Sequence, residues 1–309
     1  MSIHLNSVVS RRRFLGGAAV FSCLPSLSSL AAESESETWA FLSDTHIHAD
    51  AGFVSRNETN LSENLRRVVA EVLAEKDSLD GVLIDGDCAF NVGLPGDYEQ
   101  FAKLLAPLIE AKLPIHMTMG NHDDRGPFFQ AFADQQAKNP PVESKHVAMV
   151  ESRVANFVFL DSLRFVNKVE GEFGEAQLAW LDRMLAANPD KPTLLIGHHN
   201  PQVVPAGEVP ADQPVKITGL IDTDPFFQLI ANRPQAKAYV YGHSHNWGHK
   251  PDDSGFHLIN LPPTAYVFDL ARPNGWVKAT ISATDITLEL SALDKAHPEH
   301  GKVQTLAWR

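Results

Sequence analysis

The chain has 309 residues, of which 44% are apolar, enough for the core of one large domain or two small ones. Its formal net charge of −12 argues against a protein that binds a nucleic-acid polymer, because such proteins usually present a basic face. Beyond the N-terminus, no stretch approaches the ~20 continuous apolar residues that a membrane helix requires.

Residues 1–35 have the pattern of an export signal. Three arginines, Arg11 to Arg13, are followed by a short apolar run and then by small residues that end near Ala32. The order S-R-R-x-F-L resembles the twin-arginine signal, whose export machinery moves proteins already folded. We therefore expect an exported, periplasmic protein in which residues 36–309 form a single domain.

The two cysteines bear on the same question. Cys23 lies within the predicted signal and Cys88 within the domain, so removal of the signal leaves one thiol and no intramolecular disulfide. Residues 20–23 (V-F-S-C) also resemble a lipoprotein cleavage box, which Phe21 fits poorly. Contact with a membrane is therefore expected only if Cys23 is lipidated.

From residue 38 to residue 241, short apolar strands alternate with helical patterns. Asn60 and Glu63 resemble a capping box at the start of the first helix. Periodicity predicts helices at residues 61–73, 98–111, 127–137 and 178–185. It predicts strands at residues 39–42, 81–84, 114–119, 146–150, 154–160, 193–196 and 238–241.

The C-terminal part has a different pattern. Residues 256–261, 276–282 and 286–290 form successive strand-like runs without helices, which predicts an antiparallel finish. The whole pattern predicts an α/β fold in which helices cover sheets. Residues 201–218 hold four prolines and no clear period, as expected of a long loop that rims an active site.

Polar clusters follow five of the predicted strands, where ligand sites form in open α/β sheets. They are S-D-T-H (43–46), D-G-D (85–87), G-N-H-D-D (120–124), G-H-H-N-P (197–201) and G-H-S-H (242–245). Seven of the 14 histidines lie in or beside these clusters: His46, His48, His122, His198, His199, His243 and His245. If the last strand continued as an extended chain, alternation would bring its two final histidines to one face.

The residue types in these clusters indicate a metal centre. Aspartate, histidine and asparagine together suit Mn, Fe, Zn or Co rather than a metal that prefers thiolates. A carboxylate can bridge two ions because it has two oxygens, and pairs of ions ~3.5–4 Å apart recur in phosphatases and nucleases. We therefore expect two divalent or trivalent metal ions beyond the carboxyl ends of the strands.

Five blocks, D-x-H, G-D, G-N-H-D, H-H-x-P and G-H-x-H, stand in an order that resembles the calcineurin-like metallophosphoesterase superfamily over about residues 39–246. The chain looks most like its bacterial cyclic-nucleotide and glycerophosphodiester phosphodiesterase branch. The resemblance implies a four-layer α/β/β/α sandwich of two mixed sheets. It implies hydrolysis of small-molecule phosphate esters, with diesters preferred, by a water or hydroxide on the metals.

The resemblance also implies roles for single residues. His122 corresponds to a histidine that binds no metal and meets the phosphate, and His199 and Asn57 are candidates for the substrate pocket. The ligands follow position by position: Asp44, His46 and His245 for the first metal, Asp87 for the bridge, and Asn121, His198 and His243 for the second metal.

Several alternatives remain at this point. Asp85 competes with Asp87 for the bridge, and Asp87 is preferred because it directly follows the glycine. His198 is preferred over His199 as the ligand. The activity has two alternatives: a phosphomonoesterase of the acid-phosphatase type and, more remotely, a non-catalytic metal-binding or ligand-sensing protein.

Overall fold

The structure, a computed structural model, describes residues 35–202 and 216–309. Residues 34–309 form one compact unit. The predicted signal lies outside the described residues except for Glu35, as does most of the predicted proline-rich loop. Within the described ranges, no helix combines the length and the apolar character needed to cross a membrane.

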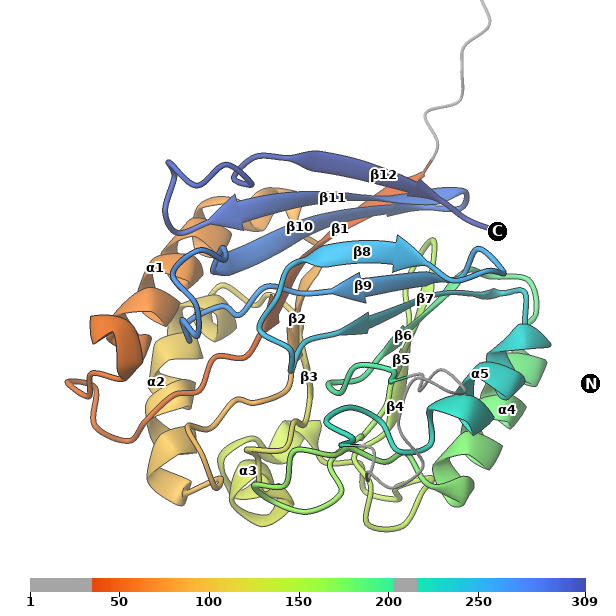
Figure 1. The fold of residues 1–309 in the computed structure, drawn as a ribbon, viewed down its shortest axis with the longest axis horizontal. Coiled ribbons are helices and arrows are strands. Elements are labelled where there is room, and N and C mark those ends of the chain that lie inside the picture. The colour runs from red at the N-terminus through yellow and green to blue at the C-terminus, as the bar shows by residue number, and fades with distance from the viewer. Residues whose placement is uncertain (1–34, 203–215) are drawn as a thin grey trace, which may run out of the picture. The chain divides into compact units, whose positions relative to one another are not determined.

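The first sheet is mixed and has the strand order β12-β11-β10-β1-β2-β3 (Figure 1). β1, β2 and β3 run parallel to one another, whereas β10, β11 and β12 extend the sheet on the other side of β1 in antiparallel pairs. Its strands are β1 (Ser36–Ser43), β2 (Gly81–Asp85), β3 (Ile115–Thr118), β10 (Gly275–Ser282), β11 (Asp285–Ala292) and β12 (Val303–Ala307).

The second sheet is also mixed, with the order β4-β5-β6-β7-β9-β8. β5, β6, β7 and β9 run parallel, and the two edge strands pair with them antiparallel. Its strands are β4 (Ala148–Glu151), β5 (Asn156–Phe159), β6 (Thr193–Ile196), β7 (Ala236–Tyr241), β8 (Gly248–Pro251) and β9 (His257–Asn260).

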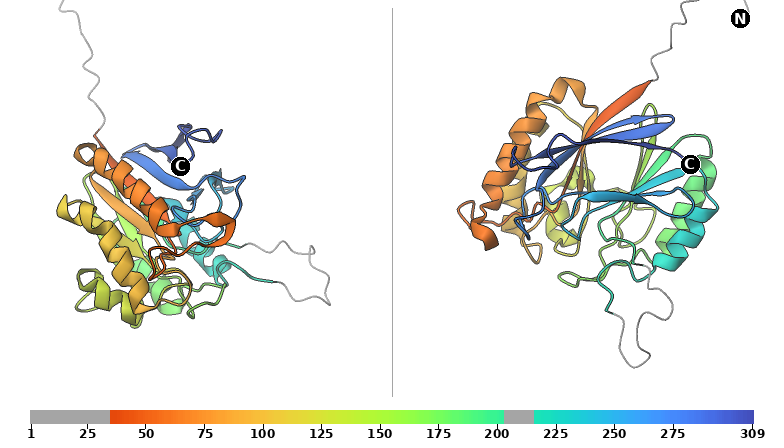
Figure 2. Two further views of the ribbon diagram at one scale, coloured as in Figure 1. Left: turned by 90° about the vertical axis from the view of Figure 1, so that its left-hand side faces the viewer. Right: turned by 45° about the horizontal axis from the view of Figure 1, so that its top comes forward.

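Helices cover the outer face of each sheet, as Figures 1 and 2 show. α1 and α2 pack on the first sheet, and α4 and α5 pack on the second. The predicted cap of α1 is present, since the Asn60 side chain accepts a hydrogen bond from the Glu63 amide at 2.8 Å. The helices are α1 (Leu61–Ala74), α2 (Pro95–Glu110), α3 (Arg125–Ala131), α4 (Glu175–Ala187) and α5 (Thr223–Ala231).

Alternation along the strands produces three apolar layers. In β1, Ala40 and Leu42 join the core beneath α1 and α2, whereas Trp39 and Phe41 join the core between the sheets. A third core lies between the second sheet and α4 and α5. Two sheets, two helical layers and three cores confirm the predicted four-layer α/β/β/α sandwich.

The alternating strands and helices predicted for the first part of the domain are present, but the antiparallel finish is only partly correct. β10 and β11 are antiparallel, whereas β9 runs parallel to β7 in the second sheet. All four residues of β9 are buried, and a strand buried on both faces is typical of the interior of a largely parallel sheet. α5, β8 and β12 were not predicted, and the expected helix at 127–137 is shorter, ending as α3 at Ala131.

Candidate active site

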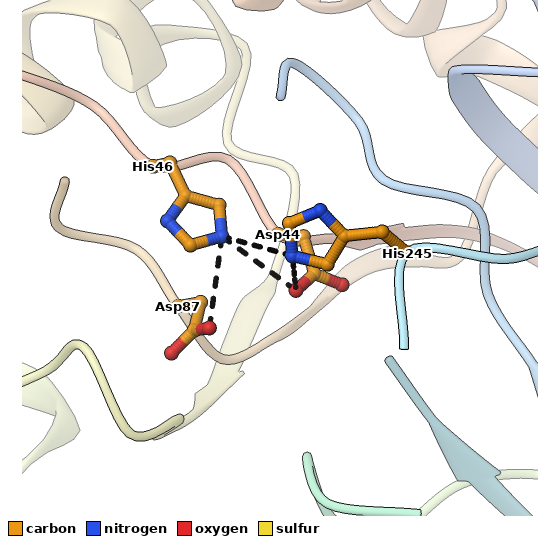
Figure 3. A group of neighbouring side chains, drawn as sticks. All are labelled: Asp44, His46, Asp87 and His245. Atoms are coloured by element: carbon orange, nitrogen blue, oxygen red, sulfur yellow. Dashed lines mark hydrogen bonds and ion pairs between the residues drawn. The ribbon is translucent and has the colours of Figure 1, made fainter. Parts of the chain in front are cut away.

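The loops that follow β1, β2, β6 and β7 bring two groups of metal-binding side chains together. In each group the donor atoms lie within 4.8 Å of one another, and Asp87 belongs to both groups. The first group is Asp44, His46, Asp87 and His245 (Figure 3), and the second is Asp87, His198 and His243.

In the first group, donor atoms of all four side chains face a common space, as Figure 3 shows. His245 Nε2 lies 3.1 Å from Asp44 Oδ1 and 3.3 Å from His46 Nε2. His46 Nε2 lies 3.6 Å from Asp87 Oδ2. The other nitrogen of His46, Nδ1, faces the Phe90 carbonyl at 3.2 Å, which fixes the ring and leaves Nε2 free to bind a metal.

The second group is held by main-chain carbonyls. His198 Nδ1 donates to the Asp85 carbonyl at 2.9 Å, so its Nε2 faces Asp87 Oδ2 at 3.1 Å. His243 uses the opposite nitrogen, because Nε2 donates to the Thr218 carbonyl at 2.6 Å and Nδ1 is left for the cluster.

Asp87 joins the two groups through one oxygen rather than two. Oδ2 is the atom near both His46 and His198. Oδ1 accepts a hydrogen bond from the His122 amide at 2.8 Å. Asp87 Oδ2 is thus the oxygen that faces histidines of both groups, while Oδ1 is held by the main chain.

Buried polar atoms without partners lie at the same place. Asp44 Oδ1, Asn121 Oδ1 and His198 Nε2 are buried and have no hydrogen-bond partner in the described structure. Leaving such an atom unpaired costs about 1–3 kcal/mol, which cation binding would offset. The donor set of carboxylate, amide and imidazole therefore fits two cations, and Asn121 Oδ1 supplies a donor beyond the acidic and imidazole groups.

The backbone at the site is strained in a consistent way. Non-glycine residues rarely adopt positive φ, at a cost of roughly 1–2 kcal/mol each, and such strain concentrates at functional sites. His243 and His245, which follow β7, both have positive φ, so the chain there is not extended. His243 belongs to the second ligand group and His245 to the first. The residues concerned are Asp44, His46, Asp87, His243 and His245, with φ between 45° and 63°.

Two glycines allow the strand ends to approach. A Cβ on Gly242 would lie 1.9 Å from Ser43 Oγ, and one on Gly120 would lie 2.2 Å from Asp87 Oδ1. No side chain fits at those distances. Gly242 therefore lets a loop of the second sheet approach the end of β1, and Gly120 lets the loop after β3 approach the loop after β2.

The charges of the site favour cation binding. Burial raises the pKa of the Asp44 and Asp87 carboxyls, but the neighbouring histidines outweigh burial and hold both pKa values well below the usual range. Burial lowers the pKa of His46, and burial together with His198 lowers the pKa of His243 to about 4. Burial also lowers the pKa of His198, but the Asp87 and Asp44 carboxylates outweigh burial and raise that pKa well above its usual value, so a cation would compete with a proton at His198 Nε2. Ionised carboxylates and neutral imidazoles are the forms that bind metals.

A cavity of about 1030 Å³ opens beside both groups. Of the predicted residues, Asn57, Asn121 and His122 line it together with ligands of each group. The sequence reading missed one whole wall, residues 266–272, and also Asn91 and Asn167. These positions lie in loops with no periodic pattern, and no sequence signal singles them out.

Two further candidates from the sequence, His199 and Asp85, lie outside the cavity lining. His199 does not line the cavity: it is fully buried beside His243, and its Nδ1 contacts Ser162 Oγ at 2.7 Å. Asp85 is buried behind the cluster and is hydrogen-bonded by Thr118, and burial raises its pKa to about 7. Neither side chain belongs to the two ligand groups.

Comparison with known proteins agrees with this geometry. A family model described as calcineurin-like phosphoesterase matches residues 38–247. The chain belongs to the calcineurin-like phosphoesterase family. The enzyme is a metal-dependent phosphoesterase, and the family fold and the two ligand groups support two metal ions.

Curated relatives of this family member are phosphodiesterases by name. The 3′,5′-cyclic adenosine monophosphate phosphodiesterase CpdA of Vibrio vulnificus is 28% identical over 266 residues, which cover 82% of this chain and 88% of that protein. The glycerophosphodiester phosphodiesterase GpdQ of Enterobacter lignolyticus is 26% identical over 213 residues, which cover 67% and 70%.

Solved structures share the family fold at low sequence identity. A dimetal phosphatase from Danio rerio superimposes with a TM-score of 0.66 at 14% identity, covering 88% of this chain and 99% of that one. The purple acid phosphatase PPD1 of yellow lupin gives a TM-score of 0.60 at 15% identity, covering 89% and 54%.

Proposed function

We propose that this phosphoesterase hydrolyses phosphodiesters at two metal ions that share Asp87. The observation that carries the proposal is the pair of ligand groups with that carboxylate in common. Asp44, His46 and His245 would hold one ion, and Asn121, His198 and His243 the other. When bound, such ions supply an activated water and neutralise charge on the phosphoryl oxygens.

His122 is proposed to act on the leaving group. Its ring lines the cavity 5.2 Å from the His46 ring. Its Nδ1 donates to the Asn91 carbonyl at 2.7 Å, so in the neutral imidazole Nε2 carries no hydrogen. The doubly protonated ring donates from Nε2, and it would pass this proton to the departing oxygen.

Diester preference is supported by the charges around the cavity. Apart from the proposed metal ligands and His122, the charged side chains among the described lining residues are Asp269 and Arg272, whose Oδ2 and Nε atoms lie 3.6 Å apart. A monoester dianion would meet no unpaired cation there beyond the metals. A diester carries one charge and a second substituent, which a cavity of about 1030 Å³ has room to hold.

The test compares matched aryl esters on protein reconstituted with Mn²⁺ or Zn²⁺. We expect kcat/KM for bis(4-nitrophenyl) phosphate to exceed that for 4-nitrophenyl phosphate. The reverse order would support the phosphomonoesterase alternative. Failure to turn over either ester with both metals bound would support a metal-binding or ligand-sensing protein.

Export to the periplasm by the twin-arginine machinery is proposed on the sequence of residues 1–35. The support is the S-R-R-x-F-L order followed by an apolar run and small residues. Replacement of Arg11 and Arg12 by lysine should leave uncleaved protein inside the cell. Mature protein at normal levels in the periplasm of that variant would contradict the proposal, and a lipid on Cys23 of purified protein would indicate the anchored form.

A further inference from the structure

Residues 266–272 form a wall of the cavity beside the first ligand group. The segment is anchored at the end of β1, where the Thr264 amide donates to the Ser43 carbonyl at 2.7 Å. The Tyr266 ring then lies 4.7 Å from the His46 ring and 5.1 Å from the His245 ring. Side chains of this segment are therefore within reach of any group esterified to a phosphate at the metals.

The wall presents apolar side chains to solvent. Phe268 is 53% exposed and Leu270 is 73% exposed, and both line the cavity. Val169, from the loop after β5, is 41% exposed and lines the same cavity. Scattered exposed apolar residues are ordinary, whereas exposed apolar residues gathered around one cavity are typical of a ligand-binding surface.

Polar contacts from another loop hold this apolar surface in place. The Arg56 guanidinium lies 4.4 Å from the centre of the Phe268 ring. Asn57 Nδ2 donates to the carbonyls of Val267 at 3.0 Å and Phe268 at 3.3 Å. Asn57, expected from the sequence to touch substrate, thus also supports the wall, which keeps Phe268 at the cavity rather than packed into the core.

We propose that this wall binds an apolar alkyl or aryl substituent of the phosphodiester. The proposal rests on the proposed phosphodiesterase function and narrows its substrate class. The charged residues of the wall that line the cavity, Asp269 and Arg272, lie together, and the Arg56 guanidinium over Phe268 does not line the cavity, so the lining of the wall would not favour a charged substituent. A bare polyol such as glycerol would leave the apolar side chains uncovered.

A series of alkyl 4-nitrophenyl phosphates, from methyl to hexyl, tests the proposal with one leaving group throughout. We expect kcat/KM to rise along the series, by up to about fourfold for each CH₂ that the wall buries. Phe268→Ser and Leu270→Ser should each lower that slope. Val303→Ser is the matched control, because Val303 is 59% exposed on β12 and does not line the cavity.

The outcomes separate this proposal from the function on which it rests. A flat series in the wild-type enzyme, or an unchanged slope in both wall variants, would overturn the apolar subsite and leave the phosphodiesterase intact. Absence of turnover for the whole series with both metals bound would instead overturn the proposed function.

A second inference comes from Gln202, which joins two separate stretches of chain. Its Oε1 accepts hydrogen bonds from the amides of Thr218 at 2.7 Å and Gly219 at 2.9 Å. Its Nε2 donates to the Lys216 carbonyl at 3.0 Å. Thr218 is also the residue whose carbonyl accepts from His243 Nε2.

We infer that Gln202 is a positioning residue for His243 and hence for one metal only. His46 Nδ1 and His198 Nδ1 donate to the carbonyls of Phe90 and Asp85, and Gln202 makes no hydrogen bond to Phe90 or Asp85. Loss of a group that bonds a metal ligand directly typically costs 10–100-fold in metal affinity, and Gln202 acts one step further out, through the main chain of Thr218. That cost should fall on the site that contains His243.

Calorimetric titration of the metal-free protein with Mn²⁺ tests this inference. Gln202→Leu should weaken one of two binding steps, by up to about tenfold, and leave the other unchanged. Gln202→Glu keeps the acceptor for both amides and should restore most of the lost affinity. Gln100→Leu is the control, since Gln100 is also half-buried but contacts Ser62, away from the site.

Thermal melting shows whether each variant folds. If Gln202→Leu does not fold, Gln202→Asn is titrated with Mn²⁺ instead. Its shorter side chain does not reach both the Lys216 carbonyl and the amides of Thr218 and Gly219, so the same weakening of one binding step is expected. Equal weakening of both binding steps in Gln202→Leu or Gln202→Asn would overturn the role of Gln202. So would unchanged metal affinity in both of these variants.

Discussion

The two sides of the metal centre are built differently. On the first side, His46 and His245 lie beside the open cavity, next to the aromatic residues Tyr266 and Phe268. On the second side, His198 has no exposed surface, and His243 depends on a carbonyl at the end of a long proline-rich stretch.

This difference separates two tasks. The open side has room and apolar surface for the substituents of a substrate, so we assign substrate selection to it. The second side also reaches the cavity, through Asn121 and His243, but its histidines pack against one another rather than against Tyr266 and Phe268, so we assign to it the constant part of the chemistry. Asp87 belongs to both sides, and the strongest tests act on it.

Replacement of Asp87 by asparagine should give the largest effect, because an amide has one good oxygen donor and no charge. We expect the affinity for both metals and the activity to fall together. Each should fall by more than the ~100-fold that follows loss of a group that only hydrogen-bonds a metal ligand. Asp85→Asn is the matched control, two residues away, since it keeps the main-chain carbonyl that holds His198. Two tightly bound ions in Asp87→Asn, measured by elemental analysis, would show that the bridge is assigned to the wrong residue.

Replacement of His122 by alanine should distinguish proton donation from simple charge stabilisation on the open side. We expect both metals to remain, with ~10²–10⁴-fold loss on a dialkyl phosphate, whose alkoxide leaves poorly. The loss on bis(4-nitrophenyl) phosphate should be much smaller, because nitrophenolate leaves without a proton.

His48→Ala is the control for His122, since His48 stacks on Phe53 with ring centres 4.2 Å apart and belongs to neither ligand group. Equal losses of kcat/KM on the two diesters in His122→Ala would remove the proton-donor role.

Replacement of Gly242 by alanine should disturb both sides together. The new methyl group would meet Ser43 Oγ at 1.9 Å, and the loop it displaces carries His243 and His245. We expect the free energy of unfolding to fall by about 1–3 kcal/mol, with weaker binding of both metals. Gly248→Ala has open space around its Cβ and should change neither quantity, so similar losses in the two variants would argue against the close approach.

The smallest effect concerns His146, which lies outside both ligand groups. Burial lowers the pKa of His146, so the folded protein keeps it neutral while the unfolded chain takes up a proton below about pH 6.5. Stability should therefore fall as pH decreases below 6.5, by at most about 1.4 kcal/mol per pH unit.

The measurement for His146 is the melting temperature of EDTA-treated protein at pH 7.5 and pH 5.5. His146→Gln keeps a donor for the Met117 carbonyl, to which His146 Nε2 donates at 3.0 Å, but does not titrate. Between pH 7.5 and pH 5.5, the melting temperature of His146→Gln should fall by less than that of the wild type. Equal falls in melting temperature would contradict the prediction.

The sequence predicts the sheets and the ligand positions because both depend on local patterns. Apolar runs that end at glycine, aspartate or histidine place Asp44, Asp87 and His198 at strand ends, where the fold collects them. The wall at Tyr266 to Arg272 has no such pattern, since its loop is placed by contacts with Arg56 and Asn57, about 210 residues away along the chain.

Main-chain features also escape sequence reasoning. The Thr218 carbonyl orients His243, yet a carbonyl is present at every residue and carries no signal. The direction of β9 depends on the crossover through β8, a four-residue strand that the pattern of G-H-K-P does not predict. The positive φ values of the ligands are likewise set by the assembled loops.

Anomalous diffraction from crystals of the Mn²⁺-loaded protein would show whether two metal ions share Asp87. We expect two peaks ~3.5–4 Å apart, with Asp87 bound to both. Asp44, His46 and His245 should complete one site, and Asn121, His198 and His243 the other. A single peak at full occupancy, or two peaks of which only one contacts Asp87, would show that Asp87 does not join two metal sites.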